Sequence, residues 1–103
     1  MSAKLIVTVD AQIAALVPRF LANRAADVGK IRAALAGADF EAIRAAAHAM
    51  KGAGGAFGFA EISRLGAAME VGVQQRDAAT IAGLVTCMED YLGRIQIQYA
   101  DEQ

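Results

Sequence analysis

Several residue types are scarce in this chain, and each scarcity excludes a class of protein. No tryptophan and a single proline occur in 103 residues, which favours a helical domain over a turn-rich β-sandwich. The single cysteine, Cys87, cannot form an internal disulfide. It lies in the helical pattern LVTCMEDYL, so we expect a small buried side chain and a reducing, cytoplasmic setting. His48 is the single histidine. No second histidine is therefore available to pair with Cys87 as a nucleophile or to complete a metal or haem site.

A surplus of charge of one sign and long apolar runs are also lacking. Ten Lys and Arg residues against eleven Asp and Glu residues give a formal net charge of -1. Without a basic stripe and interleaved aromatic residues, we expect no nucleic-acid partner. Charged residues interrupt every apolar run before the roughly 18 residues that a membrane helix needs. The start, MSAKLIVTVD, lacks the small-residue cleavage site of a signal peptide, so we expect no membrane association.

Alanine and other apolar residues are abundant instead. The hydrophobic fraction is 56%, which is enough for a folded core, and the length is near that of one compact domain. We therefore predict a single, monomeric domain over residues 1–103. Because alanine supplies much of the apolar content, few large side chains are expected in its core.

Apolar residues recur at helical spacing in successive segments with clear start and stop signals. KLIVTVD is short and β-branched, and we interpret residues 1–9 as an extended lead-in, not as a strand of a sheet. Asp10 is a good N-cap for a short helix that meets Pro18. Four longer helices are predicted from Pro18 to a stop at Gly37, from the N-cap Asp39 to about Gly55, from about Phe59, and after the polar link QQRDAAT. The fold class is all-α: an antiparallel up-down four-helix bundle with an additional short N-terminal helix.

Side chains can be assigned to the core or the surface of this bundle from the same spacing. Three methionines are predicted to fill the core, and two phenylalanines to pack at the helix break: Met50, Met69, Met88, Phe57 and Phe59. Four charged residues of the helix after Pro18 fall mostly between its apolar positions: Arg24, Asp27, Lys30 and Arg32.

His48 is predicted to face solvent in the middle of its helix. At about 100° per residue, it lies roughly 140° from the centre of the apolar stripe formed by Ile43, Ala46, Ala47, Met50, Gly54 and Phe57. The same outer face carries Glu41, Ala45, Gly52 and Gly55, and Lys51 flanks it. Each glycine inside a helix costs about 0.5–1 kcal/mol relative to alanine, and packing does not explain an outward-facing Gly52.

These residues indicate a nucleophilic histidine that carries an anion. Gly52, four residues after His48, leaves the ring uncovered, and Lys51 can offset charge on a phosphoryl group attached to the imidazole. The other ring nitrogen needs an acceptor that holds the tautomer. Glu70, at the flank of the next helix, is the best candidate. Alternatively, Glu70 is a surface residue that pairs along its own helix with Arg64 or Gln74.

The stretch AHAMKGAGGAFGF resembles the H-x-x-K-G motif of histidine-containing phosphotransfer (HPt) domains and the GF break that follows it. The segments VDAQIAALVPRFLANRAADVGKIRAAL, LGAAME and DYLGRI resemble the family as well. The resemblance implies that His48 is phosphorylated, that Lys51 lies beside the phosphoryl group, and that Gly52 gives clearance. It implies that Glu70 contacts the histidine. The second histidine of chemotaxis kinases is missing, with Ala67 in that region.

The function expected from this resemblance is a phosphorelay intermediate. It would carry a phosphoryl group on His48 between aspartates of receiver domains, in a hybrid sensor kinase, a response regulator or both. We expect no kinase activity, because the chain has neither a glycine-rich phosphate loop nor an acidic Mg²⁺ cluster. No cofactor or metal is expected on this chain, and Mg²⁺ would belong to the receiver. The partner-docking face would include Arg44, Ala45 and Gly55. The alternative is a helical interaction module with the same bundle that carries no phosphate.

Overall fold

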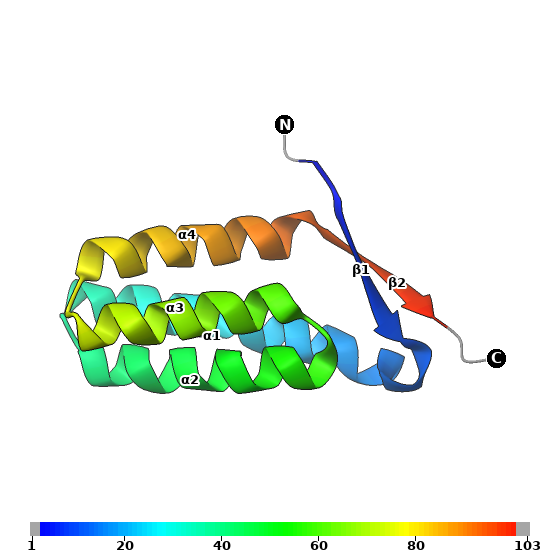
Figure 1. Ribbon diagram of the computed structural model, residues 1–103, viewed down its shortest axis with the longest axis horizontal. Helices are drawn as coiled ribbons and strands as arrows, with labels where there is room; N and C mark the ends of the chain where they lie inside the picture. Colours follow the sequence, from blue (N-terminus) through cyan, green and yellow to red (C-terminus); the bar gives the residue numbers. More distant parts are fainter. Residues whose placement is uncertain (1–2, 101–103) are drawn as a thin grey trace.

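The structure, a computed structural model that describes residues 3–100, is a bundle of four α-helices with a pair of strands at one end (Figure 1). Connections at 37–39, 58–59 and 75–77 are so short that successive helices run antiparallel. This confirms the predicted up-down bundle, and the additional N-terminal helix is a single 3-10 segment. The elements in chain order are β1 (Leu5–Asp10), η1 (Ala11–Leu16), α1 (Val17–Ala36), α2 (Phe40–Phe57), α3 (Ala60–Gln74), α4 (Ala78–Arg94) and β2 (Ile95–Ala100).

Local signals set most helix ends. The carboxylates of Asp10 and Asp39 accept backbone N–H bonds at the starts of η1 and α2, as predicted from their capping propensity. Asp77 caps α4 in the same way, with both the N–H and the hydroxyl of Thr80 donating to it. Those bonds lower the pKa of the Asp77 carboxyl below its ordinary value. At the other end of α2, Gly58 adopts the left-handed conformation with φ 84° and lets the chain turn into α3.

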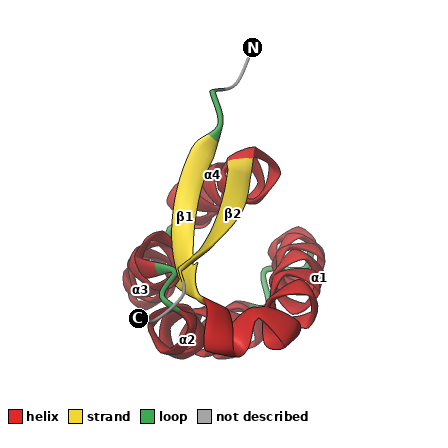
Figure 2. Ribbon diagram, turned by 90° about the vertical axis from the view of Figure 1, so that its right-hand side faces the viewer, coloured by secondary structure: helices red, strands yellow, loops and turns green. Residues whose placement is uncertain are grey.

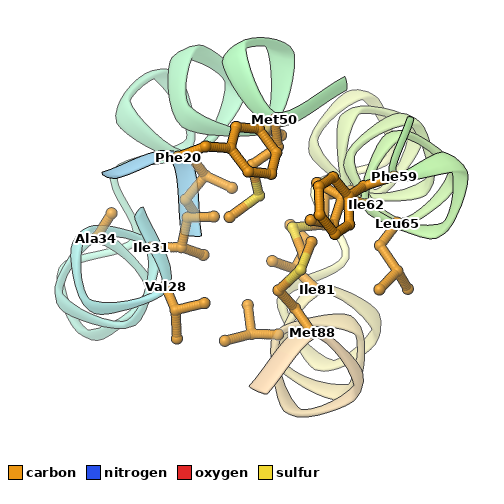
Figure 3. Packing of buried hydrophobic residues seen from close by; sticks show 14 of the residues in the cluster. Phe20, Val28, Ile31, Ala34, Met50, Phe59, Ile62, Leu65, Ile81 and Met88 are labelled. Atoms are coloured by element: carbon orange, nitrogen blue, oxygen red, sulfur yellow. The ribbon is translucent and has the colours of Figure 1, made fainter. Parts of the chain in front are cut away.

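The core lies between the four helices, and large apolar side chains make up most of it (Figure 3). The prediction of few large core side chains is therefore wrong, because most alanines of residues 3–100 lie on the outer faces of the helices and only Ala34 and Ala47 are buried. Phe20 stacks on the rings of Phe57 and Phe59, with centroids 4.4 Å and 5.0 Å away. Both predicted phenylalanines therefore pack at the α2–α3 break. The three methionines predicted to be core residues are fully buried: Met50, Met69 and Met88.

Residues 5–10 form a strand, so the interpretation of residues 1–9 as a lead-in outside any sheet is wrong; residues 1 and 2 lie outside the described part. β1 pairs in parallel with β2, from Leu5 opposite Ile95 to Asp10 opposite Ala100. The two strands lie across the end of the bundle (Figure 2). Alternate residues of β1 face the bundle, and Val9 is buried. The pairing joins segments about ninety residues apart, which no local pattern reveals.

Two side chains of α1 that were placed among its surface charges are in fact buried. Arg24 and Asp27 are only 9% and 8% exposed. The Arg24 Nε donates to Asp27 Oδ2 at 2.9 Å, and its guanidinium lies 5.2 Å from the centroid of the Phe20 ring. Each of the two charges is compensated by the other, one helical turn away. The aliphatic part of the arginine side chain can pack as an apolar group.

Cys87 is exposed, so its prediction as a buried side chain is wrong. In α4 the fully buried positions are Ile81, Val85 and Met88. At about 100° per residue, position 87 is roughly 200° from Val85, on the opposite side of the helix. The position of Cys87 around the helix therefore decides its exposure, although cysteine is apolar enough to be buried.

Val9 tests whether the sheet is part of the folded core. Replacing Val9 by Ala should lower the free energy of unfolding by about 1.5–3 kcal/mol, because buried methyl groups are lost and a cavity remains. Ile6, on the opposite face of the same strand and 65% exposed, is the control: Ile6→Ala should cost less than about 0.5 kcal/mol. Urea unfolding measures both values, and equal costs would mean that β1 does not pack on the bundle.

Candidate functional site

His48 lies on the solvent-facing side of α2, as its helical position predicts. Ile43, Ala47 and Met50 of the same helix are fully buried, whereas the His48 side chain is 69% exposed. The other residues predicted for this outer face are exposed as well: Glu41, Ala45, Gly52 and Gly55. The imidazole is therefore open to an approaching molecule.

Glu70 reaches His48 from the neighbouring helix α3. Its Oε2 lies 3.2 Å from Nδ1 of His48. A carboxylate only accepts hydrogen bonds, so Nδ1 carries a hydrogen and donates it, and the lone pair of the neutral ring is on Nε2. The contact expected between Glu70 and the histidine is present, and it leaves Nε2 as the nucleophilic nitrogen.

Of the two alternative partners for Glu70 on its own helix, Arg64 and Gln74, Arg64 is occupied elsewhere. The guanidinium of Arg64 donates two hydrogen bonds of 2.6 Å to the carboxylate of Glu61. These bonds lower the pKa of the Glu61 carboxyl below its ordinary value. The geometry thus favours His48 over Arg64 as the partner of Glu70.

Lys51 joins the same carboxylate from the next turn of α2. Its Nζ lies 3.7 Å from Glu70 Oε1, and the lysine side chain is 54% exposed. Oε1 is shielded from solvent and makes no hydrogen bond within residues 3–100. One carboxylate therefore spans the histidine and the lysine, with one oxygen toward each, and a half-exposed ammonium stays within reach of a group attached to the ring.

The glycines near His48 divide into two kinds. A Cβ at Gly52 would meet no atom of another helix within 4 Å, so packing does not require this glycine. A Cβ at Gly54 would lie 2.7 Å from the backbone N of Ser63, too close for any side chain. At Gly55 the nearest atom would be 3.5 Å away, an ordinary contact. Helix packing thus explains Gly54 and leaves Gly52 to another cause.

Arg44 lies one turn before His48 on an exposed part of α2. Its guanidinium donates to both oxygens of Glu41, with a shortest distance of 2.6 Å. These bonds raise the pKa of Arg44, and the charge of Glu70 adds a smaller contribution. The residues expected on a docking face, Arg44, Ala45 and Gly55, are all exposed, but Arg44 is engaged with a neighbouring carboxylate.

A shallow groove of about 440 Å³ lies between α1 and α2, and the sequence did not reveal it. Its lining residues are Asp27, Lys30, Ala42, Ala45, Ala46 and Ala49. Ala45 and Ala49 precede and follow His48 on α2. The alanine run of α2 was visible in the sequence, but the contribution of α1 depends on how the two helices pack.

Two further kinds of site were sought within residues 3–100. No group of three or more His, Cys, Asp or Glu side chains there is arranged to hold a metal ion. None of the helices in this part of the chain is both long enough and apolar enough to cross a membrane.

Comparison with protein families matches residues 15–98 to the Hpt domain. The chain belongs to this family, whose domains take part in histidine phosphotransfer in phosphorelays. The matched region contains all four α-helices and the whole His48 site, and it excludes β1. Comparisons with curated proteins and with solved structures gave no match.

The two kinds of glycine should respond oppositely to alanine. Gly52→Ala should raise the free energy of unfolding by about 0.5–1 kcal/mol, because alanine is the better helix former and the space is open. Gly54→Ala should lower it by about 1–3 kcal/mol, because the new methyl group overlaps the α3 backbone. Thermal or urea unfolding measures whether the free energy of unfolding rises or falls in each variant. A destabilised Gly52→Ala protein would show that Gly52 is kept for packing.

Proposed function

We propose that this chain is a phosphoryl carrier of a two-component phosphorelay and that Nε2 of His48 holds the phosphoryl group. The observation that carries the proposal is the bond from Nδ1 of His48 to Glu70, which leaves the Nε2 lone pair on an exposed ring. In the transfer, this lone pair attacks the phosphorus of an aspartyl phosphate. The P–N bond forms as the P–O bond to the aspartate breaks, and the aspartate leaves as a free carboxylate.

Lys51 and Gly52 fit two further needs of this reaction. Charge builds up on the equatorial oxygens of the phosphoryl group, and the ammonium of Lys51 can turn from Glu70 toward them through its exposed side chain. A large partner must also bring its phosphorus within bonding distance of Nε2. Gly52, with open space around it, puts no side chain in that path.

The partner in this proposal is a receiver domain of a hybrid sensor kinase or of a response regulator. The alanine-lined groove between α1 and α2 offers an apolar surface on which a helix of such a domain can rest, and Lys30 and Asp27 also line it. The Mg²⁺ that activates the aspartyl phosphate would be bound by the receiver. The chain itself then needs only to present one nucleophile and to stabilise charge, which is the work of a carrier and not of a kinase.

Transfer from a phosphorylated receiver domain tests the proposal. Incubation with a receiver carrying labelled phosphate should transfer the label to this chain in an acid-labile, alkali-stable form. His48→Gln should abolish the transfer and change the free energy of unfolding by less than about 0.5 kcal/mol, because the side chain is exposed. A labelled His48→Gln protein would sink the assignment, and an unlabelled parent protein would favour the interaction module without phosphate.

Two substitutions of Glu70 test whether it acts as a hydrogen-bond acceptor or through its negative charge. Glu70→Ala should slow phosphoryl acceptance about 10-fold, equivalent to about 1.4 kcal/mol, because the ring loses the bond that holds its tautomer. Glu70→Gln should stay within about threefold of the parent, since an amide oxygen still accepts from Nδ1. Single-turnover kinetics measures both rates. Equal losses in the two variants would show that the carboxylate acts through its charge.

A further inference from the structure

Three residues of α3 contact α2 in succession along one side of the helix: Ser63, Gly66 and Glu70. Their spacing of three and four residues places them on one face. Only Glu70 touches the imidazole. The other two contact the backbone of the α2 turn that carries it.

Gly66 lies against this turn without room for a side chain. A Cβ at position 66 would be 2.8 Å from the carbonyl oxygen of Ala47 and 2.8 Å from the backbone N of Lys51. In an α-helix these two atoms are joined by the hydrogen bond that closes the turn containing His48. All the close atoms belong to the backbone, so no side-chain rotation could relieve the overlap.

Ser63 ties the same turn to α3 with a hydrogen bond. Its Oγ donates to the carbonyl oxygen of Lys51 at 2.6 Å. The bond fixes α3 along the axis of α2, whereas the missing side chain at Gly66 allows the two helices to approach this closely. Glu70 follows Gly66 by one turn, so its distance from His48 depends on both contacts.

We infer that Gly66 and Ser63 are positioning residues, which hold α3 at the separation and axial position where Glu70 reaches Nδ1 of His48. The inference rests on the proposed function for its effect on transfer, although the geometry exists without a phosphoryl group. The contact between Glu70 and His48 tolerates only a small increase in the separation of α2 and α3. A methyl group at position 66 needs about 3.5 Å from its neighbours, so the helices must part by roughly 0.7 Å. The Nδ1 to Oε2 distance of 3.2 Å is already at the long end for a hydrogen bond, and such a shift breaks it.

The test compares Gly66→Ala with Gly72→Ala as a matched control. Gly72 is also buried in α3, and its Cβ would also have a neighbour at 2.8 Å, but that neighbour is the Ile81 side chain of α4, which can move and lies away from α2. The readout is the pair of imidazole ¹⁵N chemical shifts of His48 in the unphosphorylated protein at alkaline pH. The parent and Gly72→Ala should show hydrogen on Nδ1. Gly66→Ala should shift toward the spectrum of Glu70→Ala.

Transfer kinetics supply a second readout. Gly66→Ala should accept phosphate on the order of 10-fold more slowly, because misplacement by a fraction of an ångström weakens an oriented reaction. The double variant Gly66→Ala/Glu70→Ala should be no slower than Glu70→Ala, because both changes remove the same interaction. If Gly66→Ala does not fold, Ser63→Ala carries the test and should shift the ¹⁵N signals in the same direction. Thr86→Ala is its control, since that hydroxyl donates to a backbone carbonyl of its own helix α4 and accepts from Arg32 of α1, without a bond to α2 or α3.

The outcomes separate this inference from the proposed function. A folded Gly66→Ala protein with the parent's ¹⁵N shifts would overturn the positioning role, and so would a loss of rate that persists in the Glu70→Ala background. A parent that never accepts phosphate would remove the proposed function. The ¹⁵N shifts would then still decide whether Gly66 and Ser63 place Glu70 on the histidine.

Discussion

The close approach of α2 and α3 is the constraint on which the His48 site depends. Gly54 and Gly66 have no space for a Cβ, and in both cases the obstacle includes the backbone of the other helix. Glycine within a helix costs about 0.5–1 kcal/mol, so the bundle gives up intrinsic helix stability to bring two backbones together. The close approach allows the hydrogen bond between Glu70 of α3 and His48 of α2.

The electrostatics of the site follow from this geometry. A single carboxylate, largely shielded at 21% exposure, faces an imidazole nitrogen with one oxygen and an ammonium with the other. The second nitrogen of the exposed ring, Nε2, is not the one bonded to Glu70. In the proposed function the aspartyl phosphate of the partner would provide a good leaving group, so the chain would need few groups of its own. That reaction would also need access to the ring, and the open space at Gly52 is consistent with this need.

Local rules were sufficient for most of the fold and for the position of the histidine. The caps Asp10 and Asp39 and the 100° spacing around His48 are properties of a few neighbouring residues, and the structure has them as predicted. Helical spacing also pointed to Glu70, because its place at the flank of α3 is local. The resemblance to HPt domains implied the same contact between Glu70 and His48.

Features that depend on distant residues escaped prediction. The β1–β2 pair joins both ends of the described chain. The β-branched run of β1 and the alternation of isoleucine and glutamine after Arg94 are local signs of strands, but neither indicates that the two segments pair. Burial of Arg24 depended on its pairing with Asp27 and on the Phe20 ring. Gly66 and Ser63 looked like ordinary helix residues, because their contacts are set by the packing of α2 on α3. The error at Cys87 was different: its position on α4 was readable, but its chemical type was given more weight.

Heteronuclear NMR of the phosphorylated protein distinguishes the two ring nitrogens of His48. With ¹⁵N-labelled histidine, a phosphorus bonded to nitrogen is recognised by its coupling to that nitrogen. The geometry predicts one phosphohistidine, with phosphorus on Nε2 and a hydrogen on Nδ1 that is still donated to Glu70. Phosphorus on Nδ1, or on any residue other than His48, would contradict the arrangement described here.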